Sequence, residues 1–360
     1  MTVKKKFLPG KKTILLLIIF LTALFIRIEY MSHTIIDSPI RADALEYVLY
    51  GYNIVHHRTF SIQQDSENPL PDSKRTPGYP LFIALAFLVD EQNFFKIILY
   101  IQAVMSALMA VLTFYLGNRF LQLRWATAGA VLVAFSPHLV SMTGYVLSET
   151  LFGFVLLIGV TFFYQAIKRK SLLLFVASAL FFGYSYITTP TILFIPIFLA
   201  AIVFLFRGFV ANTKAKNRVL KQIIIFLIVY SIFPVGWGIR NKVNVPSDAL
   251  KGSVRLKIAL AYGAYPGYFY KNPLNKYYPY RDDPQWEEFS SSIKGFSKIF
   301  RERFIERPLR FIVWYLFEKP YILWSWNILQ GQGGVYVYPV ITSLYQKSDT
   351  SLQESAQKEV

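Results

Sequence analysis

The sequence contains no cysteine and only four histidines among its 360 residues. Without cysteine, disulfide bonds, thiolate catalysis and cysteine-ligated zinc or iron–sulfur centres are excluded. His33, His56, His57 and His138 form no HExxH frame, which favours solvated or interfacial histidines over a histidine metal site. No GxGxxG frame follows a strand-like segment, so a nucleotide-binding Rossmann domain is not indicated. Internal repeats are also missing.

Charged residues are scarce as well, because they make up only 16% of the chain while hydrophobic residues make up 54%. Soluble globular chains are about one quarter charged. On a soluble protein the net charge of +17 would suggest a nucleic-acid partner. Here the basic clusters fall between apolar runs and no nucleic-acid-binding motif occurs. We therefore predict an all-α polytopic membrane protein that binds no nucleic acid.

Several apolar runs are candidates for membrane-spanning helices, which need about 20 residues. The run at residues 77–89 is too short to cross, and we expect a short helix lying on or re-entering the outer face. Residues 309–329 are interrupted by Glu318, Lys319 and Pro320, so they form either an eighth span or an interfacial helix. We expect about seven to eight transmembrane helices. The candidate spans are residues 13–26, 94–116, 125–135, 145–166, 172–187, 191–206 and 222–238.

The basic clusters between the spans all fall on the side of the N-terminal lysines, which is the positive-inside pattern. This predicts an N-terminus in the cytoplasm. A signal peptide is the alternative for the first run. We prefer a retained helix, because no small-x-small cleavage site follows and because Arg27, Glu29 and Tyr30 look like an interface.

The same pattern predicts how the chain is divided. Residues 240–308 are long, polar and aromatic, and we expect them to form a small domain on the outer face. Long loops escape the positive-inside rule, so their basic residues do not contradict this placement. The predicted segments are a cytoplasmic tail (1–12), a transmembrane catalytic module (13–239) that includes a first outer loop (31–93), the outer-face loop domain (240–308), an apolar C-terminal segment (309–347) and a disordered tail (348–360).

Two groups of candidate functional residues lie in the first outer loop. Asp43, Glu46 and Tyr47 share one face of a predicted helix at residues 43–55, at positions i, i+3 and i+4. The alternative is an N-cap aspartate on a surface helix. Lys74 and Arg75 precede a Pro-Gly turn and Tyr79 in the run KRTPGYP. Paired cations suit a phosphate at the membrane surface, although they could also be snorkelling anchors.

Two further groups lie at predicted outer ends of spans. Glu149 stands in Ser148-Glu149-Thr150 and is either functional or an acid favoured by the helix dipole. Arg240 follows Trp237 in the run PVGWGIRN, where an aromatic belt with an interfacial arginine is the alternative.

Taken together, "DALEY", "RTPGYPLF", "LSETLF", "PVGWGIRN" and "KPYILWSW" give the chain a family resemblance. It resembles the polyprenyl-phosphate-sugar-dependent glycosyltransferases of the GT-C fold, over residues 13–339. The nearest relatives would be bacterial members of the protein O-mannosyltransferase and lipid A aminoarabinose transferase group. The resemblance implies a GT-C-like fold in the bacterial inner or plasma membrane.

The resemblance also implies a reaction. An acceptor hydroxyl attacks the anomeric carbon of a polyprenyl-phosphate sugar at the outer face, with inversion. Asp43 matches the family's proposed base, whereas Asp37 lacks the "DAxEY" context. Arg75, with Lys74 beside it, matches the basic residue that contacts the donor phosphate, and Arg240 occupies a second basic position. The candidate substrate-binding residues are Arg75, Lys74, Glu46, Tyr47, Tyr79, Glu149 and Arg240.

The resemblance leaves the acceptor open as a lipid, a glycan or a protein. No cofactor is certain, and carboxylates alone could hold Mg²⁺ or Mn²⁺. The sequence departs from the family at Thr189, where relatives often have arginine, and it ends soon after "WSW", so we expect a truncated chain. The alternatives are a transporter or flippase of a lipid-linked sugar and an inactive, truncated family member.

Overall fold

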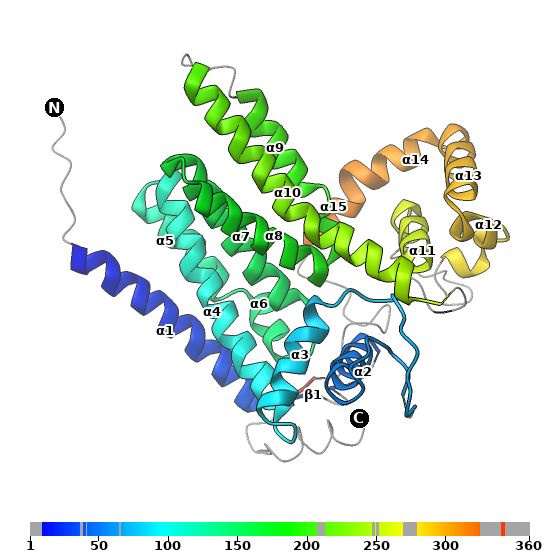
Figure 1. The fold of residues 1–360 in the computed structure, drawn as a ribbon, viewed down its shortest axis with the longest axis horizontal. Coiled ribbons are helices and arrows are strands. Elements are labelled where there is room, and N and C mark those ends of the chain that lie inside the picture. Colours follow the sequence, from blue (N-terminus) through cyan, green and yellow to red (C-terminus); the bar gives the residue numbers. More distant parts are fainter. Residues whose placement is uncertain are drawn as a thin grey trace. The chain divides into compact units, whose positions relative to one another are not determined.

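The computed structural model describes a chain made almost entirely of helices (Figure 1). Asp37, Arg41 and the predicted disordered tail lie outside the described residues. The described residues are 9–36, 39–40, 42–64, 66–206, 213–246, 249, 252–268, 279–324 and 340–342.

The chain divides into two compact units. The first unit comprises Met1–Pro71, Thr76–Val245 and Pro339–Val360, and the second comprises Asp72–Arg75 and Pro246–Tyr338. Lys74 and Arg75 therefore belong to the second unit, while the other candidate site residues belong to the first. Each unit is described by itself.

The first unit is a set of apolar helices with one small antiparallel sheet. In this sheet β1 (Thr34–Ile36) pairs with β2 (Val340–Thr342), with Thr34 opposite Thr342. The helices are α1 (Pro9–His33), α2 (Asp43–His56), α3 (Gly78–Val89), α4 (Phe94–Phe120), α5 (Leu123–Ala134), α6 (Pro137–Ser141), η1 (Met142–Gly144), α7 (Glu149–Arg169), α8 (Leu172–Thr188), η2 (Pro190–Ile192), α9 (Ile195–Phe206) and α10 (Thr213–Asn244).

Local sequence explains several helix ends. Ser136 caps α6 by accepting a hydrogen bond from the Leu139 backbone N–H, and Pro137 fits the first helical position. Ser171 caps α8 in the same way through the Leu174 N–H. Lys170 ends α7 in the left-handed conformation, with φ of 52°. These signals place the turns between the apolar runs.

Two kinds of packing hold the helices of the first unit together. Small residues let α1, α4 and α5 approach closely, with Ala23, Ala107, Ala110, Ala126 and Ala130 in one buried cluster. By contrast, α7, α8 and α10 meet through a buried aromatic cluster. Phe226 lies in this cluster with Phe163, Phe175 and Phe182, at ring separations of 5.1 to 6.3 Å.

Four described helices are long and apolar enough to cross a membrane, and the bent pair Leu123–Ala134 with Pro137–Gly144 would make a fifth. Three shorter apolar helices, Gly78–Val89, Leu172–Thr188 and Pro190–Phe206, accompany them. Apolar side chains such as Leu132, Leu173 and Val243 are exposed, as expected of surfaces facing lipid. The protein is therefore an all-α integral membrane protein, while the count of seven to eight spans stays a prediction.

Element by element, the predicted helices at residues 43–55 and 77–89 are confirmed as α2 and α3. Two apolar runs were predicted too short. The first helix extends from Pro9 to His33, beyond the predicted 13–26, and α10 extends to Asn244, beyond the predicted 238. Polar residues such as Arg27 and Arg240 end an apolar run, but they do not end a helix whose backbone hydrogen bonds can continue.

Arg27, which the sequence suggests lies at an interface, is fully buried in the structure. Its Nε donates to Ser106 Oγ over 2.7 Å, and Nη1 donates to the carbonyl oxygens of Ala23 and Ala134 over 2.8 and 2.9 Å. Nη2 donates to the Val133 oxygen over 3.2 Å. The guanidinium thus satisfies carbonyls at the C-terminal end of α5, where the helix dipole is negative.

The second unit is built on aromatic packing. Its elements are α11 (Gly252–Ala264), η4 (Pro279–Asp282), α12 (Trp286–Ser291), α13 (Ile293–Glu306), α14 (Pro308–Val313), the π-helical η5 (Trp314–Glu318) and α15 (Lys319–Trp324). Phe289 and Ile299 are buried at its centre, with Trp286 and Phe296 against them. The predicted apolar segment at 309–329 is helical as far as Trp324, where its description ends.

Candidate functional site

The first turn of α2 carries two acidic side chains, Asp43 and Glu46. Asp43 is the first helical residue, and the N-cap position belongs to Ala42, which makes no side-chain cap. The interpretation of Asp43 as an N-cap aspartate is therefore wrong. Ala42 has φ of 51°, a conformation that costs a residue other than glycine about 1–3 kcal/mol. The strained residue directly precedes the carboxylate that sequence predicts as the base.

Tyr47, one turn further along α2, connects three of the sequence motifs. Its ring meets the edge of Tyr79 with centroids 5.0 Å apart. Its hydroxyl donates to Ser148 Oγ over 3.4 Å, and Ser148 in turn donates to Glu149 Oε2 over 3.5 Å. Both hydrogen bonds are long. The residues DALEY, PGYP and LSET, separated widely in sequence, therefore lie side by side in the first unit.

Behind this contact lies a buried amide that sequence analysis missed. Tyr79 donates its hydroxyl to Gln102 Oε1 over 2.8 Å. Gln102 Nε2 donates to the carbonyl oxygens of Tyr145 and Thr143, over 2.8 and 3.3 Å. Because Gln102 is fully buried, these bonds fix the irregular segment that leads to Ser148. A polar residue in the middle of an apolar run was the signal that could have identified it.

The start of α3 is locked against the end of α8. A Cβ on Gly78 would lie 2.6 Å from the Thr188 backbone nitrogen, so only glycine fits this approach. Tyr184 donates its hydroxyl to the Gly78 carbonyl over 3.0 Å. The motif RTPGYP therefore meets the segment that contains Thr189, the position where the sequence departs from the family.

Arg240 lies in the last two turns of α10 and contacts the first loop. Its guanidinium carbon is 4.9 Å from the ring centroid of Trp237 and 5.3 Å from that of Phe60, and Nη2 donates to the Phe60 carbonyl over 3.3 Å. Phe60 also stacks on Tyr50 of α2 at 4.2 Å. The arginine thus ties α10 to α2 through one phenylalanine.

Lys74 and Arg75 lie in the second unit, where Arg75 is buried with an exposed fraction of 6%. The Lys74 backbone N–H donates to Asp72 Oδ1 over 3.0 Å, which forms an Asx turn. A Cβ on Gly252 would lie 2.8 Å from the Ser73 carbonyl oxygen, so α11 starts close against this segment. Burial argues against a snorkelling anchor, whose charged head stays in water.

Among the candidate residues, the structure places the ring of Tyr79 against Tyr47, joins Tyr47 to Glu149 through Ser148, and connects Arg240 to α2 through Phe60. Asp43 and Glu46 stand on the first turn of the same helix. Ser148, Phe60 and Gln102 were not predicted, because their role depends on contacts between distant segments.

Comparison with protein families gives one match, to the model described as "Oligosaccharyl transferase STT3, N-terminal", over residues 76–270. This interval is more than half of the chain and contains Tyr79, Gln102, Glu149 and Arg240. No curated protein sequence matches the chain. The match supports the GT-C glycosyltransferase fold predicted from the sequence.

Proposed function

The chain belongs to the family of oligosaccharyl transferase STT3, N-terminal, and on that premise we propose that it transfers a sugar from a polyprenyl-phosphate donor to an acceptor hydroxyl. The family makes the chain a membrane glycosyltransferase. The donor, inversion at the anomeric carbon and reaction at the outer face are our proposals. We also propose that the chain belongs to the protein O-mannosyltransferase and lipid A aminoarabinose transferase group.

One observation carries the proposal, namely the meeting of three motifs around Tyr47. Asp43 stands one helical turn from that residue, and the N-terminal end of α2 favours its negative charge. In the proposed step, Asp43 takes the proton of the acceptor hydroxyl. The hydroxyl oxygen bonds to the anomeric carbon, and the bond to the phosphate oxygen breaks with its electron pair.

The leaving polyprenyl phosphate needs positive charge, which we assign to Arg75 and Lys74. Guanidinium and ammonium groups stabilise developing phosphate charge. Glu46 and Glu149 are proposed to contact the sugar, the fully buried Tyr79 to position Tyr47 beside it, and Arg240 to support the first loop. The acceptor could be a lipid, a glycan or a protein.

Oligosaccharyl transferases of this family generally depend on a divalent cation. Within the described ranges, no group of three or more histidine, aspartate or glutamate side chains could hold a metal ion. The described residues therefore do not supply a complete protein-built metal site, and we assign no step to a metal.

The proposal is tested by transfer from labelled polyprenyl-phosphate sugars. The purified full chain, reconstituted in lipid vesicles, is incubated with one labelled donor at a time and a lipid, glycan or peptide acceptor. We expect labelled product from at least one donor, with the opposite anomeric configuration. Release of label from none of the donors, or product with retained configuration, would refute the proposed reaction.

We further propose an N-terminus in the cytoplasm, with residues 31–93 and 240–308 outside. Since the chain has no cysteine, single cysteines can report sidedness without background. Asn68→Cys and Ser297→Cys should react with a membrane-impermeant reagent in intact cells, whereas Lys12→Cys and Lys170→Cys should react only after lysis. The reverse pattern would overturn the orientation.

A further inference from the structure

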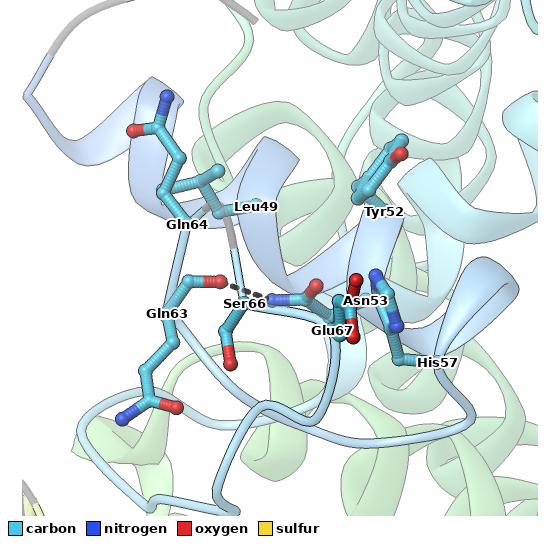
Figure 2. Close-up of a pocket in the computed structure, with 8 residues that line it drawn as sticks. All are labelled: Leu49, Tyr52, Asn53, His57, Gln63, Gln64, Ser66 and Glu67. Carbon is cyan, nitrogen blue, oxygen red and sulfur yellow. Dashed lines mark hydrogen bonds between the residues drawn. The ribbon is translucent and has the colours of Figure 1, made fainter.

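A pocket of about 300 Å³ lies at the C-terminal end of α2, away from the residues assigned to catalysis (Figure 2). It is formed by α2 and by the loop that follows it, entirely within the first unit. Its volume is at the lower end of the range for small-ligand sites. The lining residues are Leu49, Tyr52, Asn53, His57, Gln63, Gln64, Ser66 and Glu67.

The loop that forms this pocket is held in place. Asn53 Nδ2 donates to the carbonyl oxygens of Ser61 and Gln63, both over 2.9 Å, and Figure 2 shows the bond to Gln63. The Leu70 backbone N–H donates to Gln63 Oε1 over 2.7 Å, which closes the loop on itself. Arg240 holds Phe60 at the other side of Ser61. The pocket is therefore built in advance of any ligand.

Polar atoms in the pocket are left open for a ligand. Asn53 has an exposed fraction of only 3%, and its two amide hydrogens are used by the loop. Its Oδ1 accepts no hydrogen bond from the residues that the structure describes. The side chains of Tyr52, Gln64 and Ser66 likewise make no hydrogen bond within that part of the chain. These polar atoms are available to a ligand that supplies O–H or N–H groups, which would replace the water that solvates them.

The composition of the pocket selects the class of ligand. Among the residues that the structure describes, no lysine or arginine lines it, although the chain carries a net charge of +17. A phosphate or carboxylate would meet Glu67 there without a permanent cation beside it. Amide and hydroxyl groups instead pair with groups that both donate and accept, as sugar hydroxyls do. The aromatic ring of Tyr52 adds an apolar surface.

The pocket is too far from the proposed base to hold the reacting sugar. Asn53 follows Asp43 by ten residues of continuous helix, which is a rise of about 15 Å. One sugar ring cannot span that length. We infer that the acceptor is a neutral glycan of several sugar units, one of which binds in the pocket lined by α2, Gln63, Gln64, Ser66 and Glu67 while another presents its hydroxyl to Asp43. This inference rests on the proposed function.

Binding of neutral tetrasaccharides to the full chain tests the inference. Tetrasaccharides of glucose, mannose, galactose or N-acetylglucosamine are each added to the purified protein, and binding is followed by saturation-transfer NMR. We expect at least one to bind. Gln64→Ala combined with Glu67→Gln should weaken it about tenfold through lost hydrogen bonds. Ser66→Trp, which fills the pocket, should abolish binding.

Asn68→Ala is the matched control, because Asn68 is exposed on the same loop and does not line the pocket. It should bind like the parent. The inference is overturned if none of the four tetrasaccharides binds, if binding survives Ser66→Trp unchanged, or if Asn68→Ala loses binding equally.

Failure of the inference can be told from failure of the proposed function. A chain that transfers sugar but binds no tetrasaccharide would refute the pocket alone. A chain that binds a tetrasaccharide through the pocket but transfers no sugar would refute the reaction alone.

Discussion

In the first unit the buried polar side chains that join the helices bond to hydroxyls, amides and backbone carbonyls, whereas in the second unit ion pairs join the elements. Among the described residues, Gln102 and Asn53 are buried amides bonded to neutral groups, and the buried Arg27 guanidinium donates to the Ser106 hydroxyl and to backbone carbonyls. In the second unit Arg303 Nη2 lies 2.7 Å from Asp283 Oδ2, and Arg310 pairs with Glu318.

The contrast has a physical reason. A charge in an apolar bilayer is costly, so membrane helices are joined more cheaply by hydroxyls, amides and backbone carbonyls. A unit that contacts water can keep ion pairs at partly exposed positions, where solvent reduces the cost of desolvation. It follows that the charged side chains of the first unit other than the buried Arg27 should matter for chemistry more than for stability.

Asp43→Asn should have the largest effect. The amide keeps the shape of the carboxylate but cannot accept the proton, so turnover should fall by about 10²–10⁴-fold. Folding and donor binding should be nearly unchanged. Initial rates of sugar transfer and a thermal unfolding curve measure both quantities.

Asp37→Asn is the control for this prediction, since it alters another aspartate of the same loop. It should lower turnover much less. Parental turnover in Asp43→Asn, or loss of turnover in Asp37→Asn instead, would show that Asp43 is not the base.

Arg75→Ala tests whether this buried cation of the second unit binds the donor phosphate. The alternative is that Arg75 only pairs with an acidic side chain. If Arg75 holds the donor phosphate, donor affinity should fall by about 2–5 kcal/mol. Arg75→Lys should recover only part, because an ammonium lacks the planar fork of guanidinium. Titration with a labelled donor measures the affinity, and an unchanged value in Arg75→Ala would remove this residue from the site.

Gln102→Leu and Arg303→Met test the contrast directly. The first leaves the Tyr79 hydroxyl and two carbonyls without their partner and should destabilise the first unit by about 1–3 kcal/mol. The second leaves Asp283, whose side chain is only 5% exposed, without its cation and should cost the second unit about 1.5–3 kcal/mol.

Hydrogen exchange, measured separately on peptides from each unit, shows in which unit each variant lowers the stability. Gln122→Leu, at an exposed glutamine, is the control and should change stability by less than about 0.5 kcal/mol. If Gln102→Leu were as mild as this control, the buried amide would not hold the first unit together.

Salt should have the smallest effect. At about 1 M salt the screening length is about 3 Å, so the partly exposed pair of Arg303 and Asp283 weakens by at most about 1 kcal/mol. Exchange should then rise slightly in peptides of α12 and α13 and stay constant in peptides of α4. If exchange rose equally in the peptides of α4 and in those of α12 and α13, the contrast between the two units would be contradicted.

The GT-C fold was predicted from the family resemblance of the motifs, whereas apolar runs and their flanking residues were enough to predict that the protein lies in a membrane and that α2 and α3 are helices. These features depend on local composition and helical periodicity, which can be seen in short windows of sequence. The resemblance also selected Tyr47, Tyr79 and Glu149; in the structure the ring of Tyr79 contacts Tyr47, and Ser148 joins Tyr47 to Glu149.

Contacts between distant segments could not be predicted in this way. The burial of Arg27, the bonds of Gln102 to the segment before Ser148, and the pocket behind Asn53 each join residues separated along the chain. The sequence by itself determined where helices form, because each helix satisfies its own backbone hydrogen bonds. Only the tertiary structure decided which polar side chains meet, because side-chain partners come from whichever helices pack together.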